Sequence, residues 1–375
     1  MWIWINFIEY WEEMIDGHGD DLYRYGSIVA NFSSNVYNEV DHSLLWKHLR
    51  ERMECMVSYP EPQPYTLEGR IAAGCGTGPG HVCVTNGATE AIYLIAQKFA
   101  GSRSVIFVPA FSEYGDACKI HHHRVAGAGS LAEIDMLCRT GGVDVVWICN
   151  PNNPTGIVQP KGELDALVKR YPGVVFVVDQ SYEFFTIKEV FTVAEVVQRK
   201  NLILLHSMTK RYAVPGVRLG YMTACEDLLE QIREVRMPWS VNAFAIETGL
   251  FLLQNDISRS TDISMLLERS RALAQKLETL GGVAGPFFNV EPSDTHYMLI
   301  EIVKGLKYPA SSPVGGELSD SDSAACLKEY LATECGILIR DASNFATLGR
   351  GHFRIATQTD SQNRLLIEAL EKLCI

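Results

Sequence analysis

The sequence predicts an α/β protein built on a mostly parallel sheet. Short apolar runs rich in Val, Ile and Leu recur along the first two thirds of the chain, and helical patterns follow several of them. These runs are continuous rather than alternating, which is typical of strands buried on both faces of a parallel sheet. The chain has 375 residues, 47% hydrophobic and 21% charged, so we expect two domains with a substantial core.

The elements follow one another in a strand–helix rhythm. The first predicted strand, 82–85, precedes a helix over 88–99, and the second, 104–108, precedes a helix over 113–120. A third strand at 143–150 precedes a helix over 162–170. Strands at 174–179, 201–207 and 219–223 complete the set. Such alternation predicts parallel strands joined by crossover helices.

The pattern changes from about residue 244. Long helical stretches run to residue 280, and shorter strands are predicted at 296–302 and 352–357. Between these strands, residues 304–323 are rich in Ser, Gly and Pro, which predicts a surface loop. The C-terminal part therefore reads as a second domain of α+β type.

Composition excludes several classes of protein. The net charge is −12 and the pI is near 5.4, which disfavours nucleic acid and anionic membrane as partners. None of the ten cysteines forms a C-x-x-C pair, so we expect reduced thiols in a cytoplasmic protein. Consecutive histidines at 121–123 cannot converge on one ion, and we expect no metal.

The first 21 residues begin apolar but lack the basic start and cleavage site of a signal peptide. They are also too short to span a bilayer. We expect an amphipathic arm that packs on the body or on a partner subunit.

An anion site is predicted where the first strand turns into its helix. Residues 86–90 read NGATE, and a glycine with free N–H groups at a helix N-terminus suits a phosphate. The alternative is an ordinary turn capped by Asn or Thr.

Two more features stand at the ends of predicted strands. Residues 150–156 read NPNNPTG, an irregular loop at the edge where open α/β sheets bind ligands, although a rigid turn is the alternative. Asp179 closes the apolar run 174–179, where a carboxylate needs a partner such as a protonated ring nitrogen, or else caps the next helix. Tyr182 follows and could reach a neighbouring ring oxygen.

The strongest motif spans residues 207–220, SMTKRYAVPGVRLG. Lys210 follows an apolar strand, where an amine can be desolvated and activated for Schiff-base chemistry. Ser207 and Arg218 supply a hydroxyl and a guanidinium for a phosphate. A solvated loop of Lys and Arg would explain neither the hydroxyls nor the Pro-Gly pair.

Together these motifs resemble the class I/II aminotransferases, which depend on pyridoxal 5′-phosphate (PLP). The resemblance rests on S-x-T-K followed by P-G-x-R-L-G, on the NPNNPTG loop, and on the spacings of 26, 31 and 8 residues that link Asn153, Asp179, Lys210 and Arg218. It runs from about His18 to the C-terminus. It implies fold type I: a large domain with a seven-stranded sheet, a smaller α+β domain formed from both chain ends, and a homodimer with shared active sites.

On that resemblance the domains would be an N-terminal arm and part of the small domain over 1–45, the large cofactor domain over 46–255, and the small domain over 256–375. Lys210 would hold PLP, Asp179 would bind the pyridinium proton, and Asn153 and Tyr182 would bond the ring hydroxyl. The phosphate would lie among Gly87, Ala88, Thr89, Ser207 and Arg218. Phe111, or second to it Tyr114, would stack on the ring; Tyr59 would reach the phosphate in the other subunit; Arg354 would clamp the substrate carboxylate.

Two subgroups of the family share further strings with this chain. YPEPQP at 59–64 and Ile339-Arg340-Asp341 resemble histidinol-phosphate aminotransferases. MPWSVNA at 237–243, FSEYG at 111–115 and the early His18-Gly19 resemble threonine-phosphate decarboxylases of cobalamin biosynthesis, which we favour. Both act on phosphorylated amino acids or amines, so Arg340, with His18 and Asn35, is expected to bind substrate; for Arg340 the alternative is an ion pair with Asp341 or another acid.

Two other classes of protein require features that this sequence does not show. A non-catalytic PLP-binding sensor domain would need a DNA-binding module, and the acidic chain offers none. A dehydrogenase would need a glycine fingerprint opening the first βα unit, which is absent.

Overall fold

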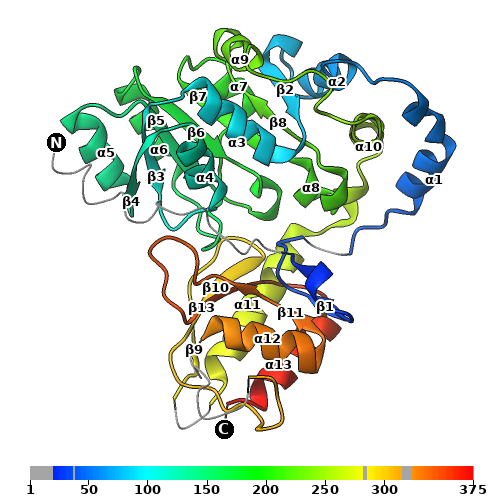
Figure 1. Ribbon diagram of the computed structural model, residues 1–375, viewed down its shortest axis with the longest axis vertical. Helices are drawn as coiled ribbons and strands as arrows, with labels where there is room; N and C mark the ends of the chain where they lie inside the picture. The colour runs from blue at the N-terminus through cyan, green and yellow to red at the C-terminus, as the bar shows by residue number, and fades with distance from the viewer. Residues whose placement is uncertain (1–19, 37–38, 282–284, 315–322, 375) are drawn as a thin grey trace.

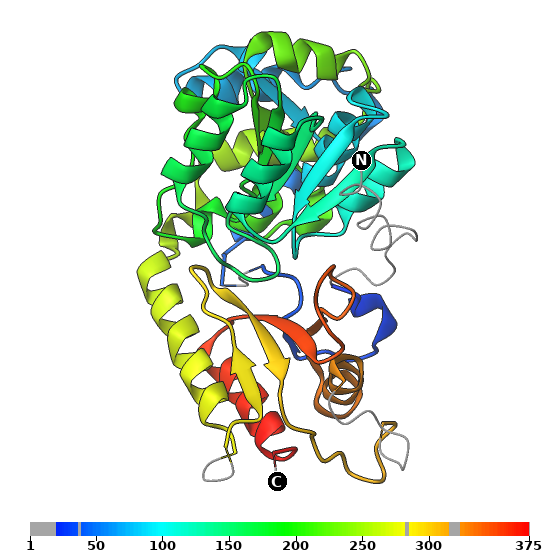
Figure 2. The same ribbon diagram turned by 90° about the vertical axis from the view of Figure 1, so that its left-hand side faces the viewer.

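The computed structural model describes residues 20–36, 39–281, 285–314 and 323–374. Figure 1 shows two bodies along the long axis: a larger one around a seven-stranded sheet, and a smaller one around an antiparallel sheet. The view turned by 90° in Figure 2 separates the same two bodies. The predicted division at about residues 45 and 255 stays a prediction.

The large sheet confirms the predicted α/β class. Its strands are β2 (Val82–Thr85), β3 (Arg103–Phe107), β4 (Arg124–Ala128), β5 (Val145–Cys149), β6 (Val175–Asp179), β7 (Leu202–Ser207) and β8 (Gly220–Thr223). They are ordered β2-β8-β7-β6-β5-β3-β4. Only β8 runs antiparallel to its neighbours, β2 and β7, so the sheet is mostly parallel. β4 is a strand that the apolar pattern did not predict.

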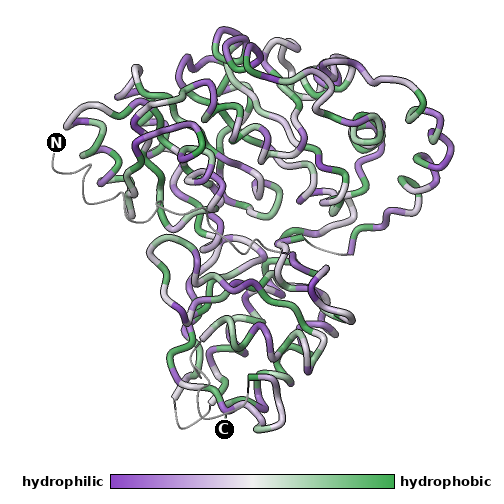
Figure 3. The backbone as a smooth tube through the Cα atoms, viewed as in Figure 1, coloured by the Kyte–Doolittle hydropathy of each residue, from purple (hydrophilic) through white to green (hydrophobic). Residues whose placement is uncertain are grey.

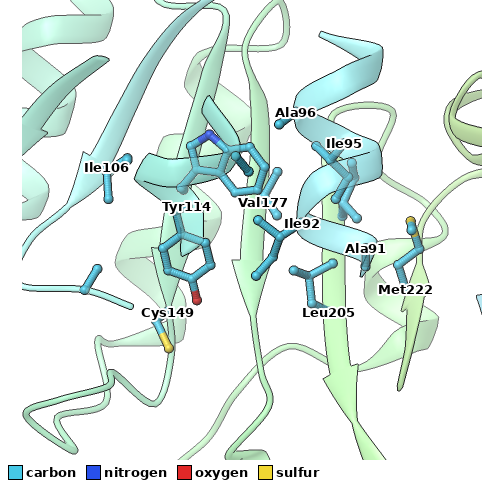
Figure 4. Packing of buried hydrophobic residues seen from close by; sticks show 14 of the residues in the cluster. Ala91, Ile92, Ile95, Ala96, Ile106, Tyr114, Cys149, Val177, Leu205 and Met222 are labelled. Carbon is cyan, nitrogen blue, oxygen red and sulfur yellow. The ribbon is translucent and has the colours of Figure 1, made fainter. Parts of the chain in front are cut away.

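Both faces of this sheet are buried, as the continuous apolar runs predicted. Trp147 and Ile148 are consecutive residues of β5, so their side chains point to opposite faces of the sheet, and they lie in different core clusters. Figure 4 shows the first face, where Ile92 and Ile95 of α3 approach Val177 of β6 and Leu205 of β7. Helices α5 and α6 contribute to the cluster on the second face.

The helices of the large body are α1 (Ser43–Glu51), α2 (Tyr65–Gly74), α3 (Gly87–Lys98), α4 (Glu113–Ile120), α5 (Leu131–Thr140), α6 (Lys161–Arg170), α7 (Val193–Val196), α8 (Met208–Arg211), α9 (Glu226–Arg233) and α10 (Ala243–Gln254). α1 lies at the outer edge in Figure 1, where it contacts α10.

The smaller body contains a four-stranded antiparallel sheet, ordered β12-β13-β10-β9. Its strands are β9 (Phe288–Val290), β10 (Tyr297–Ile302), β12 (Arg340–Asp341) and β13 (His352–Ala356). Helices α11 (Ile263–Thr279), α12 (Ala324–Cys335) and α13 (Asp360–Glu371) share its core. From the other end of the chain, β1 (Ala30–Asn31) pairs in parallel with β11 (Ile337–Leu338). Both chain ends therefore build this body.

Two predictions concern segments that the structure describes only in part. Of the predicted loop 304–323, residues 304–314 contain no helix or strand. Of the predicted N-terminal arm, residues 1–19 lie outside the described residues. Among the residues that are described, no helix has the length and apolar character needed to cross a membrane.

The topology brings the chemical motifs to one edge of the large sheet. Cys149, the last residue of β5, is in register with Asp179, the last residue of β6, and Asp179 is in register with Leu205 of β7. The NPNNPTG loop, Asp179 and the Lys210 segment therefore leave the sheet side by side. This is the carboxyl edge at which open α/β sheets bind ligands.

Candidate active site

A pocket of about 510 Å³ opens at this edge, between the two bodies. Most of the predicted site residues line it together. They are Ala88, Thr89, Phe111, Tyr114, Asn153, Asp179, Tyr182, Ser207, Lys210, Arg218, Arg340 and Arg354. The sequence positions span more than 260 residues, so the fold, rather than proximity in the chain, assembles the site.

Lys210 lies in the one-turn helix α8, directly after β7. Its Nζ donates a hydrogen bond to the carbonyl oxygen of Ser34 at 3.0 Å and lies 5.9 Å from the centre of the Tyr182 ring. Burial, followed by the positive charge of Arg354, lowers the pKa of Lys210 to about 8. A lysine amine with such a pKa is partly neutral near physiological pH and can act as a nucleophile.

Asp179 is buried and held by two donors. The Tyr114 hydroxyl donates to Oδ2 at 2.7 Å, and the backbone N–H of Ser181 donates to Oδ1 at 2.9 Å. The short 3₁₀ turn that follows has Tyr182, not Asp179, at its N-cap position, so the helix-capping alternative does not hold. A fixed carboxylate facing a pocket suits a cationic ring N–H.

Tyr114 has two structural contacts of its own. Its ring stacks on Trp147 at a centroid distance of 5.8 Å, while its hydroxyl is committed to Asp179. Burial raises the pKa of Tyr114 well above its ordinary value, so the hydroxyl stays a donor. Phe111, which is less buried and also lines the pocket, is the better placed of the two for stacking on a ring.

The N-terminus of α3 and the groups around it form the part of the site that suits an anion. Helix α3 begins at Gly87, and its N-cap Asn86 makes no side-chain capping bond. The alternative of a turn capped by Asn is therefore not observed, and backbone N–H groups remain for a ligand. Gly87 has φ +79, and a Cβ there would lie 2.7 Å from Nη2 of Arg218. Ser207 Oγ lies 2.7 Å from Thr209 Oγ1 in the same pocket. These groups match the size and charge of a phosphate.

Two arginines enter the pocket from the smaller body. Arg354 on β13 donates to Asn153 Oδ1 and to the carbonyl oxygen of Ser33. Arg340 on β12 donates from Nη2 to Asn344 Oδ1 at 2.9 Å. Burial, and then the charge of Arg354, lowers the pKa of Arg340 to about 10. In the described part of the chain Arg340 makes no ion pair, so the predicted alternative of a pair with Asp341 is not observed.

Tyr182 is buried beside these arginines. Its ring packs edge-on against Tyr297 at 4.9 Å, and burial raises its pKa to about 12. The phenol is therefore a neutral donor, as the prediction of a bond to a ring oxygen requires.

Three predicted residues that the structure describes do not line the pocket: Gly87, Asn35 and Tyr59. Gly87 stands at the start of α3, directly before the pocket residue Ala88. Asn35 is fully buried, and neither of its amide atoms has a hydrogen-bond partner within the described chain. Tyr59 is 86% exposed on the outside of the large body, so within one chain it cannot reach the site. His18 lies outside the described residues.

The structure also adds residues that the motifs did not indicate. Ser33 and Ser34 orient Arg354 and Lys210 through backbone carbonyls, which carry no sequence signal. Asp20 lines the pocket, although a single acid so far from the other motifs gave no reason to select it. Cys149 also lines the pocket, in register with Asp179 of the neighbouring strand. No group of His, Cys, Asp and Glu in the described residues could hold a metal ion.

The chain is similar to known proteins along most of its length. The family model for aminotransferase class I and II matches residues 27–370, and the chain belongs to this family. It is 28% identical to the threonine-phosphate decarboxylase of Salmonella typhimurium over 356 residues, 92% of this chain and 91% of that protein. It is likewise 28% identical to the histidinol-phosphate aminotransferase of Thermoanaerobacter sp. over 334 residues, 84% of each chain.

Solved structures agree. The L-threonine-O-3-phosphate decarboxylase of Porphyromonas gingivalis superposes with a TM-score of 0.82 at 37% identity, covering 92% of this chain and 98% of that one. A PLP complex of the histidinol-phosphate aminotransferase of Sinorhizobium meliloti superposes with a TM-score of 0.79 at 19% identity, covering 94% and 92%. The fold is therefore fold type I, and the cofactor is pyridoxal 5′-phosphate.

The pocket residues fit this cofactor. An uncapped helix N-terminus with a glycine that must lack a Cβ suits the phosphate. The amine of Lys210 suits the aldehyde, and Asp179 suits the ring nitrogen.

Proposed function

We propose that this protein is a decarboxylase of a phosphorylated amino acid, with L-threonine O-3-phosphate as the substrate that fits best. The observation that carries the proposal is the pair Arg340 and Arg354 in one pocket. L-Threonine O-3-phosphate bears a carboxylate and a phosphate on neighbouring carbons, and each is a group that arginine binds bidentately. The likeness to two threonine-phosphate decarboxylases supports the same choice.

Arg354 is the arginine that we assign to the substrate carboxylate. Its guanidinium is already held by Asn153, a residue of the cofactor loop, which fixes the carboxylate with respect to the cofactor. Arg340 then meets the phosphate. Two anchors on one substrate restrict its rotation, so that one bond at Cα stands perpendicular to the cofactor ring.

PLP supplies an electron sink for the bond that breaks at Cα. Asp179 keeps a negative charge at the ring nitrogen and thereby favours its protonated form. Tyr182 donates its phenolic hydrogen toward the ring oxygen. Lys210, with its pKa near 8, can hold or release a proton at Nζ once the substrate amine has replaced it.

We further propose that the working form is a homodimer. Exposed apolar residues gather along residues 46–65, including Trp46 (59% exposed), Met56 (58%), Val57 (81%) and Tyr59 (86%). Trp239 joins them, because its ring lies 5.5 Å from that of Tyr59. Helix α1, at the edge of this surface, carries both hydrophobic and hydrophilic stretches in Figure 3. A second copy covering this surface would place Tyr59 against the partner's phosphate site.

Transamination of histidinol phosphate is the second candidate. YPEPQP at residues 59–64 and the likeness to histidinol-phosphate aminotransferases support it. That substrate has a phosphate but no carboxylate, so it would leave one of the two arginines without an anion until the amino acceptor binds.

The deciding experiment offers the PLP-loaded protein L-threonine O-3-phosphate without any keto acid and follows carbon dioxide and aminopropanol phosphate. Steady release of both supports the decarboxylase. No release, with conversion of the cofactor to its amine form by histidinol phosphate, would instead assign the transaminase. Inertness toward both compounds, with PLP firmly bound, would favour a non-catalytic sensor.

A further inference from the structure

Asp20 is one of three acidic side chains in a pocket that also contains four basic ones. It lines the same cavity as Lys210, Arg340 and Arg354. Its Oδ1 accepts a hydrogen bond from Nδ2 of Asn31 at 2.7 Å, which ties it to strand β1 of the smaller body. No partner for its Oδ2 is present among the residues that the structure describes.

A short series of hydrogen bonds links Asp20 to the segment that holds the reactive amine. Asn31, which donates to Asp20, accepts from the backbone N–H of Ser33 at 2.9 Å. The carbonyl oxygen of the next residue, Ser34, accepts from Nζ of Lys210 at 3.0 Å. Asp20 is thus connected, through Asn31 and the Ser33–Ser34 segment, to the amine with which the amino group of a substrate must exchange.

Of the negative charges that raise the pKa of Lys210, Asp20 acts more strongly than Asp179. The acids that raise the pKa of Arg340 are instead Asp341 and Asp21.

The other two acids of the pocket have hydrogen-bond partners of their own. Asp179 is held by Tyr114 and Ser181 at the ring-nitrogen position. Glu113 accepts a hydrogen bond from the Tyr93 hydroxyl at 2.8 Å. Asp20 is the pocket acid that is bonded to the smaller body, which also carries Arg340 and Arg354.

A pocket with cations alone would bind any small dianion of the right size, including inorganic phosphate. A free amino acid carries an ammonium group, which needs a hydrogen-bond acceptor of negative charge when water is removed. An acid that merely repelled the anionic groups of the substrate would weaken binding. An acid placed at the amino end distinguishes an amino acid from other anions.

We propose that Asp20 accepts the ammonium group of the incoming substrate and so selects zwitterionic phospho-amino acids over anions of the same shape that lack an amine. This inference rests on the proposed function, since it presumes a substrate with phosphate and carboxylate. It names a specificity residue that acts in the first, non-covalent complex.

The substitution that tests this proposal is Asp20→Asn. Asp20 has φ +63, a left-handed conformation that asparagine adopts readily. The amide oxygen can still accept from Asn31, so the substitution removes the charge and keeps the anchor. If Asp20 only holds the chain in place, Asp20→Asn should behave like the wild type.

Asp21→Asn is the matched control. It removes the same charge from the next residue, which pairs with Lys328 at 2.5 Å and does not line the pocket. Melting temperature and retention of PLP report whether each variant keeps its structure.

Binding is measured on PLP-loaded protein treated with borohydride, which fixes the cofactor on Lys210 and prevents any reaction with the ligand amine. Isothermal titration compares L-threonine O-3-phosphate with 3-phosphooxybutanoate, in which hydrogen replaces the ammonium group. We expect the wild type to prefer the amino compound. Asp20→Asn should bind it roughly 10- to 100-fold more weakly, the range expected for one charge-assisted hydrogen bond.

The two ligands separate the possible failures. Asp20→Asn should bind 3-phosphooxybutanoate as well as or better than the wild type, and Asp21→Asn should keep the wild-type preference. An unchanged ratio of the two affinities in Asp20→Asn would overturn the role of Asp20 while leaving the proposed function intact. Failure of both ligands to bind the wild type would overturn the proposed function and this inference with it.

Discussion

Arg340 on β12 and Arg354 on β13 are direct partners across an antiparallel strand pair, and both guanidinium groups enter the pocket that contains Lys210. Two buried cations on paired strands repel each other: the pKa of Arg340 is lowered first by burial and then by the charge of Arg354. Such an arrangement is unfavourable for folding unless an anion joins it. It indicates that the site is organised for a ligand with more than one negative group.

This repulsion predicts that Arg340 favours anion binding but lowers the stability of the ligand-free protein. Replacing Arg340 by Met should stabilise the ligand-free protein by about 1–3 kcal/mol, because it removes a desolvated like charge while keeping most of the volume. It should also abolish stabilisation by inorganic phosphate. Thermal melts with and without phosphate measure both effects, and Arg340→Lys is the control that keeps the charge. If Arg340→Met melts at or below the temperature of the wild type, the charge of Arg340 does not destabilise the ligand-free protein.

The hydrogen bond from Tyr114 to Asp179 predicts a selective loss of activity. Tyr114→Phe removes a 2.7 Å donor from a buried carboxylate, yet leaves the ring stacked on Trp147. We expect kcat to fall about tenfold, since a hydrogen bond to a charged group contributes about 1.5–3 kcal/mol. Asp179→Asn should cost considerably more. Steady-state kinetics on both variants tests the order, and an equal loss in the two would contradict a supporting role for Tyr114.

The pKa of Lys210 predicts how cofactor capture depends on pH. The folded-state pKa lies near 8 instead of 10.5, so the amine is charged below pH 8 and a neutral nucleophile above it. The rate at which cofactor-free protein forms the imine with PLP should therefore rise with a midpoint near pH 8. Stopped-flow absorbance gives this profile.

Two variants test the cause of that midpoint. Arg354→Met removes a charge that lowers the pKa of Lys210 and should move the midpoint upward. Asp20→Asn removes a charge that raises it and should move the midpoint downward. Identical midpoints in all three proteins would mean that neither charge acts on the amine.

The exposed apolar surface around Tyr59 predicts self-association. The molar mass in solution should be about twice the 41.8 kDa of one chain. Met56→Glu should give a monomer that releases PLP, because charge in a buried interface is costly. Leu365→Glu, on α13 of the smaller body, is a control with a similarly exposed apolar residue. Light scattering that finds a wild-type monomer with full activity would contradict the shared site.

Much of the fold could be predicted from sequence because the parallel strands are continuous apolar runs. β2 agrees with the predicted 82–85 at both ends, and β6 and β7 end at Asp179 and Ser207 as expected. β4 has the sequence RVAGA, whose small residues give little apolar signal, and its identity as a strand depends on pairing with β3. The short strands β1, β11 and β12 likewise exist through pairing partners far away in the chain.

The candidate site likewise contains residues that the sequence pattern predicts and residues that it does not. Lys210, Asp179 and the NPNNPTG loop lie at strand ends, where position in the chain already implies a common edge. Resemblance to the family, not the sequence pattern, predicts Arg340 and Arg354. The pattern does not indicate Asp20, Ser33 or Ser34, because the chain returns to the pocket there through tertiary contacts with β1 and β11, which no local periodicity encodes.

The central claim is that Lys210 carries the cofactor in this pocket, and peptide mapping tests it most directly. PLP-loaded protein is reduced with borohydride, digested, and searched by mass spectrometry for the pyridoxyl group. The account predicts a single modified peptide containing Lys210, together with loss of the imine absorbance and of all turnover in Lys210→Ala. A pyridoxyl group on another lysine, or an intact imine band in Lys210→Ala, would contradict it.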